Sequence, residues 1–418
     1  MFKIIALSFF FLINLGIIFY FFNLESSGVN TYMALGRITG LLGVYLILWE
    51  LIFVSRLEFI TKAFKSATRL ARSHHIVGFL ALLFIFIHPI FLAIAYGQTT
   101  GRNIIAQLVA MFSWEELPMA YLSLLVFIVA IVFSYRQIKK KYRYEFWYLI
   151  HVTMYLAIFW AFEHQLELGT DLQNTLFAIY WYLLYFIFFA ALVLGRVLPP
   201  ALNFYRHRFR VSKVVKENDF CTSVYITGRN LASFKFKSGQ YGIFRFLNMN
   251  AWQAHPFSFS CVLNGEQLRI TVKALGDFTK DLDQKIKLGD YVMVAGPYGD
   301  LVLPKESTKK LALIAGGIGV TPFFSMAQEA KVRNIDFKCI WSNSRRQDII
   351  LENELEAYHI ISQEEGRINA DKLKTLLPDY LDRAFYICGP KPMMAECLRI
   401  LDEIGVNKEE VHTEKFSF

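Results

Sequence analysis

Cysteine is scarce in this chain. Its 418 residues include five cysteines, all between positions 221 and 397, and no two of them form a CxxC pair. This pattern excludes a zinc ribbon and a disulfide framework, and it indicates a reducing compartment for the second half. Charged residues are also few, at 19%, whereas 55% of the residues are hydrophobic. The length allows two or three domains, and the composition is too apolar for an ordinary soluble protein.

Long apolar runs occupy the first half of the chain. Six of them are long enough to cross a bilayer, which takes about 20 residues of helix. They are residues 3–23, 33–54, 73–96, 117–135, 145–164 and 175–198. The first run is too long for the apolar part of a signal peptide, and no A-x-A cleavage site follows it. We therefore expect it to be the first of six spanning helices.

The loops between these runs predict how the chain is oriented. The net charge is +9, and basic residues concentrate in alternate loops, within residues 56–72, 136–143 and 206–210. By the positive-inside rule these loops are cytoplasmic, which places both termini in the cytoplasm. The basic excess then reflects a multi-pass protein of the cell (plasma) membrane in contact with lipid, and no nucleic-acid partner is predicted.

Four histidines lie in two of the apolar runs. His74 and His88 share one run, and His151 and His164 share another. Each pair spans about 20 Å along its helix, with one member near the cytoplasmic end and one toward the outer side. Polar side chains in lipid are usually functional, and imidazole is a common axial ligand of haem iron. The pattern predicts two stacked bis-histidine haem b groups; the alternative is four histidines that only pack and form hydrogen bonds.

Helical rotation discriminates among the histidines. At about 100° per residue, the 14 residues from His74 to His88 return to within about 40° of the same face. His75 would miss His88 by about 140°, so His74 is the better ligand candidate. His151 and His164 are 13 residues apart and show the same mismatch, and their run holds no other histidine. Their pairing needs a helix that frays or tightens near His164, and no residue pattern explains this.

The second half changes character. From about residue 208 to 302, short β-rich segments alternate with turns, which predicts a small antiparallel β-barrel. From about residue 308, strands alternate with helices, as in a parallel α/β domain. We expect three domains: a six-helix transmembrane di-haem domain at 1–200, a β-barrel at 205–303 and an α/β domain at 308–418.

Two short motifs in the β-rich region fit a flavin. "HPFSFS" at 255–260 offers an aromatic ring for the flavin, a hydroxyl group as donor near N5 and a histidine near the phosphates. "GDFT" at 276–279 supplies a glycine turn with a threonine N-cap, which directs backbone N–H groups at an anion, and Lys273 adds positive charge nearby. Taken singly, these motifs also fit an ordinary strand and a capped surface helix.

Two motifs in the α/β region fit a dinucleotide. "IAGGIGVTP" at 314–322 follows a predicted strand and opens a helix, which is the context of a phosphate-binding loop. It differs from G-x-G-x-x-G because Pro322 replaces the last glycine. "CGP" at 388–390 ends a later parallel strand, at the edge where such sheets bind ligands. Cys388 by itself also fits a small buried residue.

The whole series resembles the NADPH oxidase and ferric reductase superfamily over nearly all of the chain. The shared order is six helices, "HPFS", "GDFT", "AGPYG" at 295–299, "GGIGVTP", "CGP" and a final "HTEKFSF". The second half is similar to the ferredoxin–NADP reductase module. The resemblance implies electron transfer from NADPH through FAD and two haems to an acceptor outside the cell.

The resemblance also implies roles for single residues. It assigns the inner haem to His74 and His151 and the outer haem to His88 and His164. It assigns FAD to His255, Pro256, Phe257, Ser258, Lys273, Gly276 and Thr279. It assigns the nicotinamide dinucleotide to Gly317, Gly319, Val320, Thr321, Pro322, Cys388, Gly389 and Pro390. Phe416, with Phe418 as an adjacent alternative, matches an aromatic that covers the flavin and yields to nicotinamide.

Basic residues indicate the nucleotide. "SNSRR" at 342–346 follows the second strand of the α/β region, and the family has a similar basic residue there. Arg345 or Arg346 can pair with a 2′-phosphate, which favours NADPH over NADH. The alternative is a solvated run of charge.

The acceptor is the least constrained feature. Arg37 lies near the outer end of the second run, and an arginine inside a membrane needs a partner. A haem propionate or nascent superoxide would serve; the alternative is that the side chain extends to the outer surface. We predict reduction of O2 to superoxide, with a ferric chelate as the alternative acceptor. The chain has no large outer loop and no EF-hand loop, so no obligate protein activator is predicted. A haem carrier without catalysis, or a membrane-tethered flavin reductase, would each leave half of the motifs unexplained.

Overall fold

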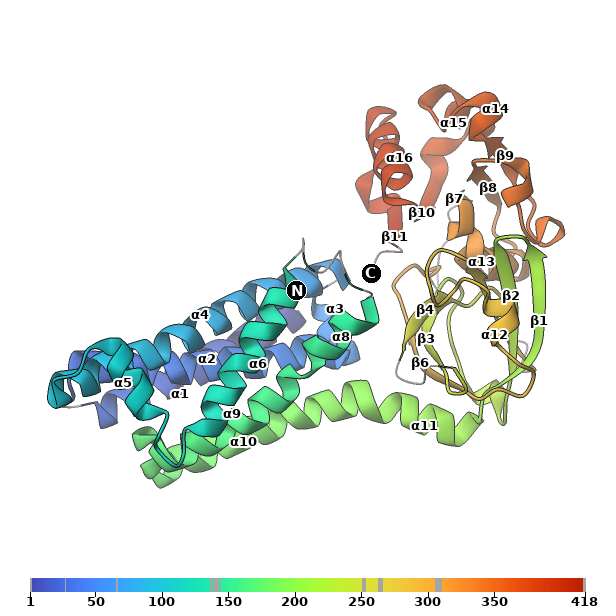
Figure 1. The fold of residues 1–418 in the computed structure, drawn as a ribbon. Coiled ribbons are helices and arrows are strands. Elements are labelled where there is room, and N and C mark those ends of the chain that lie inside the picture. Colours follow the sequence, from blue (N-terminus) through green and yellow to red (C-terminus); the bar gives the residue numbers. More distant parts are fainter. Residues whose placement is uncertain are drawn as a thin grey trace. The chain divides into compact units, whose positions relative to one another are not determined.

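The structure is a computed structural model in two compact units, residues 1–198 and 199–418, which are described separately. The described residues are 2–26, 28–64, 67–135, 138, 142, 144–249, 253–261, 266–304 and 310–415. Helices are the regular elements of the first unit in these ranges, and the second unit combines sheets with helices (Figure 1). The division into three domains stays a prediction.

The first unit is a bundle of apolar helices. They are α1 (Phe2–Glu25), α2 (Thr31–Ser55), α3 (Glu58–Phe64), α4 (Ala67–Thr100), α5 (Ile104–Met111), α6 (Pro118–Ser134), α8 (Tyr144–Val152), α9 (Met154–Leu168) and α10 (Thr175–Leu192). Helix α11 (Leu198–His207) follows and belongs, apart from its first residue, to the second unit. Five stretches are long and apolar enough to cross a membrane: Lys3–Glu25, Thr31–Ser55, Arg69–Thr100, Glu145–Leu168 and Thr175–His207. The sixth predicted span corresponds to α6, which is apolar but has 17 residues. The protein is therefore a membrane protein, and its sixth crossing remains a prediction.

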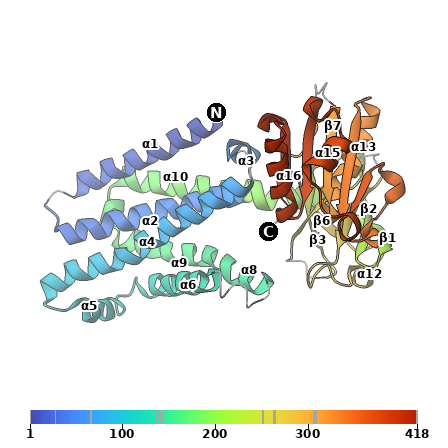
Figure 2. The ribbon, with the colours of Figure 1, turned by 90° about the horizontal axis from the view of Figure 1, so that it is seen from above.

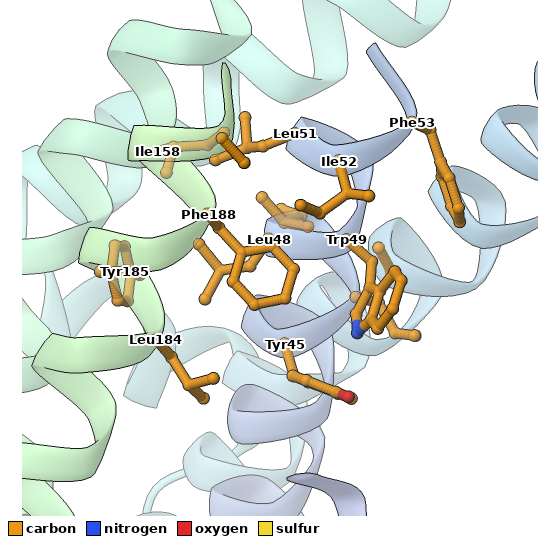
Figure 3. Close-up of a cluster of buried hydrophobic side chains, with 14 of the residues drawn as sticks. Tyr45, Leu48, Trp49, Leu51, Ile52, Phe53, Ile158, Leu184, Tyr185 and Phe188 are labelled. Atoms are coloured by element: carbon orange, nitrogen blue, oxygen red, sulfur yellow. The ribbon is translucent and has the colours of Figure 1, made fainter. Parts of the chain in front are cut away.

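Helix α2 is the most enclosed helix of this bundle. Its side chains Leu48 and Trp49 pack against Phe188 of α10 (Figure 3), and the Trp49 and Phe188 ring centroids lie 5.7 Å apart. On another face, α2 carries glycines where α4 approaches, and Figure 2 shows the two helices side by side. A Cβ atom on Gly36 would lie 2.5 Å from the Leu92 side chain, so only glycine allows this approach.

The β-rich part of the second unit forms two antiparallel sheets. One has the order β1 (Arg210–Asn218), β2 (Cys221–Thr227), β5 (Leu268–Lys273), and the other β4 (His255–Ser258), β3 (Tyr241–Phe246), β6 (Val292–Tyr298). Isolated bridges join Arg210 to Tyr291 and Phe259 to Ile270. A few further backbone hydrogen bonds, such as Val292 N–H to Phe209 and Ser260 N–H to Arg269, join the two sheets at these edges. The described strands therefore form two three-stranded sheets that are joined at both edges without a continuous ladder, and the predicted barrel is not confirmed. Between the sheets lies an aromatic core that includes Phe244 and Phe259.

The α/β part has the predicted parallel sheet. Its order is β11 (Val411–Lys415), β10 (Arg383–Gly389), β7 (Lys310–Gly316), β8 (Phe337–Asn343), β9 (Tyr358–Ile361). The main helices are α13 (Thr321–Val332), α15 (Ala370–Leu376) and α16 (Lys391–Glu403), and α12 (Leu282–Lys285) and α14 (Ser362–Glu365) are short. The chain runs outward from β7 to β9 and returns on the other side of β7 with β10. That reversal creates a switch point between β7 and β10, where parallel sheets bind ligands.

A buried ion pair ties the β-rich part to the α/β part. Arg269 of β5 donates to both carboxylate oxygens of Glu354 at 2.6 Å, and the arginine side chain is buried. The guanidinium also lies over the ring of Phe324 in α13, 5.6 Å from its centroid. A bidentate contact of this kind fixes orientation as well as distance.

Candidate functional site

Two histidines from different helices lie close together in the first unit. The ring centroids of His74 on α4 and His151 on α8 are 6.0 Å apart, with the ring planes at 84°. Two nitrogen–metal bonds of about 2.1 Å, plus the distance from each nitrogen to its ring centre, also total about 6 Å. The separation therefore fits one metal ion between the rings. The neighbouring His75 is exposed, whereas His74 is half-buried.

His88 is held in one tautomer by helix α2. Its Nδ1 donates to the backbone carbonyl of Gly36 at 2.7 Å. Because a carbonyl can only accept, Nδ1 carries the proton and Nε2 keeps the lone pair that a metal needs. A Cβ atom on Gly40 would lie 2.7 Å from His88 Nδ1, so this glycine provides the space for the ring. His164 of α9 is near enough to His88 for an electrostatic interaction.

The rotation mismatch between His151 and His164 has a structural cause. The helix is interrupted between α8 and α9 at Thr153, which lies between the two histidines. The Thr153 backbone N–H donates to Ile150, and the Leu156 N–H donates to Thr153, both in three-residue turns. Such turns rotate about 120° per residue instead of about 100°. The tightening therefore brings His164 closer to the face of His151 than a regular helix would.

Arg37 has a carboxylate partner on a distant segment. Its Nε donates to Asp171 Oδ2 at 3.0 Å, a second nitrogen donates to Asp171 Oδ1, and a third donates to the Glu25 carbonyl at 3.0 Å. The arginine side chain is 10% exposed, so it does not extend to the surface. Three of its five N–H donors are thus engaged by the protein itself, and a role toward a haem or an acceptor remains a prediction.

The two predicted flavin motifs lie next to each other. The ring of His255 in β4 stacks on Phe278 of "GDFT", with centroids 3.7 Å apart. Ser258 ends β4, and its hydroxyl is buried without a hydrogen-bond partner among the described residues. An unsatisfied buried hydroxyl is uncommon, and a bound ring with an acceptor atom would satisfy it. Phe257 and Pro256 pair with β3, opposite Gly242 and Ile243.

Thr279 does not have the predicted N-cap role. Its Oγ1 accepts from the N–H groups of Leu275 and Gly276, both at 3.0 Å, and so closes the turn that precedes it. The next helix, α12, begins at Leu282 with Asp281 in the cap position. The expectation was wrong because the hydroxyl binds backward along the chain. Lys273 lies at the end of β5, opposite Cys221 in β2.

The structure brings the two nucleotide motifs into contact. A Cβ atom on Gly319 would lie 2.4 Å from the Cys388 carbonyl oxygen and 2.7 Å from Gly389 Cα. Gly317 has φ +51°, and its carbonyl accepts from Trp341 Nε1 at 3.0 Å. The loop is therefore held by β8 and by β10, at the predicted switch point. Its glycines are required by close approach and by backbone conformation.

Helix α13 begins directly after this loop. A short turn spans Gly317–Val320, and α13 starts at Thr321 with Pro322 in its first turn. The Thr321 hydroxyl donates to the Ile318 carbonyl at 3.0 Å, and the Val320 side chain is buried. A helix N-terminus at the carboxyl edge of a parallel sheet favours an anionic group. Pro390 occupies the cap position of α16 on the β10 side.

Glu414 was missed by the reasoning from sequence. It lies in β11 opposite Cys388, and its Oε2 is buried without a hydrogen-bond partner among the described residues. Burial, together with the nearby Asp300 carboxylate, raises the pKa of Glu414 to about 8. A Cβ atom on Gly299 would lie 2.9 Å from Glu414 Oε1 and 3.1 Å from the Tyr241 ring. Glu414 thus links the α/β strands with the strand that pairs with Ser258, and a lone acid inside a strand was the available signal.

The two arginines of "SNSRR" differ in their surroundings. Arg345 pairs with Asp348 at 3.2 Å, and its guanidinium lies 5.4 Å from the Phe220 ring centroid. Arg346 is exposed and begins the turn Arg346–Asp348. Asn343, at the carboxyl end of β8, is buried, and neither amide atom has a hydrogen-bond partner among the described residues. Arg346 and Asn343 are therefore the available polar groups at this edge. Phe416 and Phe418 lie outside the described residues.

Three family models match consecutive parts of the chain. "Ferric reductase like transmembrane component" matches residues 39–162, "FAD-binding domain" matches 208–302, and "Oxidoreductase NAD-binding domain" matches 313–399. The first match includes three of the four histidines and ends two residues before His164. Because the last two matches cover the flavin and nucleotide motifs, the chain contains FAD-binding and NAD-binding domains of an oxidoreductase.

Curated relatives and solved structures resemble part of the chain. The flavohemoprotein of Bacillus anthracis is 32% identical over 245 residues, which cover 50% of this chain and 60% of that protein. The glycine betaine monooxygenase reductase subunit of Chromohalobacter salexigens is 28% identical, with 50% and 64% covered. The chain thus spans less than two thirds of these relatives. The ferredoxin reductase in carbazole 1,9a-dioxygenase aligns with a TM-score of 0.45 and 21% identity over 50% of this chain and 68% of its own.

Proposed function

Since this chain has the domain architecture of the NADPH oxidase and ferric reductase-like superfamily, we propose that it carries electrons across the membrane. The electrons come from cytoplasmic NADPH, pass through FAD and two stacked bis-histidine haem b groups, and reach an acceptor outside. O2 is the proposed acceptor, reduced to superoxide, and a ferric chelate is the second candidate. The site lies in a cell-membrane protein with both termini in the cytoplasm.

The placement of the four histidines is the observation that carries the proposal. The 6.0 Å separation of His74 and His151 fits one iron, and the Nδ1 contact of His88 leaves its Nε2 available. His74 and His151 would hold the inner haem, and His88 and His164 the outer haem. The bound cofactors supply the redox chemistry: hydride acceptance by FAD and one-electron transfer by haem iron.

The residues of the second unit support binding and orientation. Gly317 allows the left-handed turn of the loop and Gly319 allows its close approach to β10, and the N-terminus of α13 favours the diphosphate of a dinucleotide. Glu414 presents an unsatisfied polar atom opposite Cys388, and Ser258 presents another in β4; these groups are proposed to contact the nicotinamide and flavin rings. Because the pKa of Glu414 is raised to about 8, its carboxyl group holds a proton at neutral pH. It can therefore donate a hydrogen bond to a bound ring.

The proposed acceptor follows from size and access. O2 needs no dedicated recognition residues, and it reaches an apolar bundle through lipid as well as through water. A ferric chelate is large and charged and requires a receptive outer surface. Arg37 supports neither acceptor specifically, since three of its N–H donors are engaged by Asp171 and Glu25. Phe416 is proposed to cover the flavin until nicotinamide displaces it.

One preparation tests the proposal. The full-length protein is purified with its cofactors, and NADPH is added without oxygen while the haem absorption bands are recorded. Reduction of both haems, dependent on FAD, is expected. O2 uptake with superoxide-dependent cytochrome c reduction is then compared with ferric-chelate reduction. Protein that binds haem but cannot reduce it with NADPH would contradict the electron path, and faster chelate reduction would replace O2 by the second candidate.

A further inference from the structure

An acidic side chain lies inside the membrane unit without a role in the function proposed so far. Glu50 is on α2, within the span Thr31–Ser55, and its side chain is 14% exposed. Ionisable side chains within spanning helices are rare and are usually functional. Its position in the interior of the bundle excludes extension to the membrane surface.

Glu50 contacts the histidine that is proposed to ligate the inner haem. Its Oε2 is hydrogen-bonded to His74 Nδ1, and its Oε1 is buried without a partner among the described residues. A carboxylate can only accept, so Nδ1 carries the proton and Nε2 keeps its lone pair. The contact therefore selects the ligating tautomer of His74. Gly78, one turn after His74, lies next to the carboxylate, because a Cβ atom there would be in van der Waals contact with Glu50 Cδ at 3.7 Å.

The two proposed haem sites differ in the group that accepts the hydrogen bond from histidine Nδ1. On the outer side, His88 Nδ1 donates to the neutral carbonyl of Gly36 at 2.7 Å. On the inner side, His74 Nδ1 donates to a carboxylate. A charged acceptor draws the Nδ1 proton more strongly, which makes Nε2 a better electron donor to iron. Donation of this kind stabilises the oxidised metal and lowers its reduction potential.

We propose that Glu50 is a positioning residue that orients His74 and lowers the reduction potential of the inner haem below that of the outer haem. The inference rests on the proposed function. A lower potential at the inner site makes the electron step from the inner to the outer haem downhill. The direction of electron transfer then depends on which groups accept the hydrogen bonds from Nδ1 of His74 and Nδ1 of His88, namely Glu50 and the Gly36 carbonyl.

The test is a potentiometric titration of the full-length, haem-loaded protein. Glu50→Gln keeps the size and one acceptor oxygen but removes the charge. The lower of the two haem midpoint potentials is expected to rise while the other stays in place, with the ratio of haem to protein unchanged. In a His88→Leu background, which isolates the inner haem, the same rise is expected. Glu167→Gln is the charge-matched control, because Glu167 is exposed, and it should move neither midpoint.

The outcomes separate the two claims. Unchanged midpoints in haem-loaded Glu50→Gln protein, or a shift of the outer haem alone, would overturn the role of Glu50 and leave the electron path intact. If the glutamine variant loses haem, Glu50→Asp takes its place, since it withdraws the carboxylate while keeping its charge. A smaller rise supports the inference, and an unshifted midpoint overturns it. Wild-type protein that binds no haem contradicts the proposed function itself.

Discussion

The two units of this protein differ in where their apolar side chains lie. The first unit is apolar on its outside, where Ile105 and Phe186 are 75% and 71% exposed, and both charged side chains of α2 have partners inside. The second unit is apolar inside, and among its buried polar atoms those of Ser258, Asn343 and Glu414 have no hydrogen-bond partner among the described residues. Lipid cannot satisfy a polar group, so the first unit pairs Arg37 and Glu50 internally, although the second carboxylate oxygen of Glu50 has no partner among the described residues.

This difference indicates where to look for function in each unit. In the membrane unit, the buried charged side chains Arg37 and Glu50 are informative, because burying a charge is unfavourable even when it is paired. In the second unit, the informative groups are those that lack partners, because a bound cofactor would complete them.

Removing an inner ligand should have the largest effect. His74→Leu is expected to abolish one haem completely, because the remaining His151 offers one ligand only. Absorption spectra and the haem-to-protein ratio measure the loss. His75→Leu is the matched control on the adjacent exposed residue and should retain both haems. If His75→Leu loses a haem and His74→Leu does not, the ligand assignment is wrong.

Filling the space beside His88 should affect the outer haem. Gly40→Ala places a methyl group 2.7 Å from His88 Nδ1, so the ring must move and its contact with Gly36 must weaken. We expect most of the outer haem to be lost and the inner haem to remain. Gly16→Ala is the control, because a Cβ atom at Gly16 has no neighbour within 4 Å. Full haem content in both variants would argue against His88 as a ligand.

Breaking the buried ion pair between Arg37 and Asp171 should destabilise the membrane unit. Asp171→Asn leaves the Arg37 guanidinium with a neutral partner, and such a loss costs about 3 to 5 kcal/mol. Thermal unfolding in detergent measures this effect. The exposed pair Lys62–Glu58 is the control, and its loss should cost less than about 1 kcal/mol. Replacing both Arg37 and Asp171 by apolar residues should recover much of the stability, and equal costs for the two pairs would contradict the distinction.

The pKa of Glu414 predicts a pH dependence in the second unit. Between the ordinary value of 4.5 and the raised value of about 8, the folded state holds a proton that the unfolded state has lost. Stability should therefore fall as pH rises through this window, by at most about 1.4 kcal/mol per pH unit, and level off above pH 8. Glu414→Gln should flatten this slope. Denaturant unfolding of NADP-free protein at pH 5, 6, 7 and 8, followed by FAD fluorescence, compares the two.

The smallest expected effect separates two neighbouring arginines. Arg346→Ala should raise the KM for NADPH about 10- to 100-fold, since a charged hydrogen bond contributes about 1.5 to 3 kcal/mol, and should change the KM for NADH little. Arg345→Ala should have a weaker effect, because Arg345 is already paired with Asp348. Steady-state kinetics with both nucleotides distinguish the variants. Equal changes for NADPH and NADH would exclude a contact with the 2′-phosphate.

Much of the fold was predictable because it depends on local pattern. Hydropathy predicted the spans, and the alternation of strands with helices predicted the parallel sheet of β7, β8 and β10. The N-cap role of Thr279 was wrong and the barrel was not confirmed, since both depend on how segments pair after folding. The two nucleotide motifs were placed at strand ends by sequence, and their contact through Gly319 and Cys388 emerged from the topology.

Residue types and their spacing along the chain were enough to select the candidate site residues: four histidines in apolar runs, and glycine-rich motifs after β strands. The tertiary structure alone decided what those residues touch. Arg37 meets Asp171 across 134 positions, His88 meets Gly36 across 52, and His74 meets Glu50 across 24. Composition and periodicity act over a few turns of chain, whereas a tautomer, a paired charge or an unsatisfied carboxyl group depends on the segments that folding brings alongside.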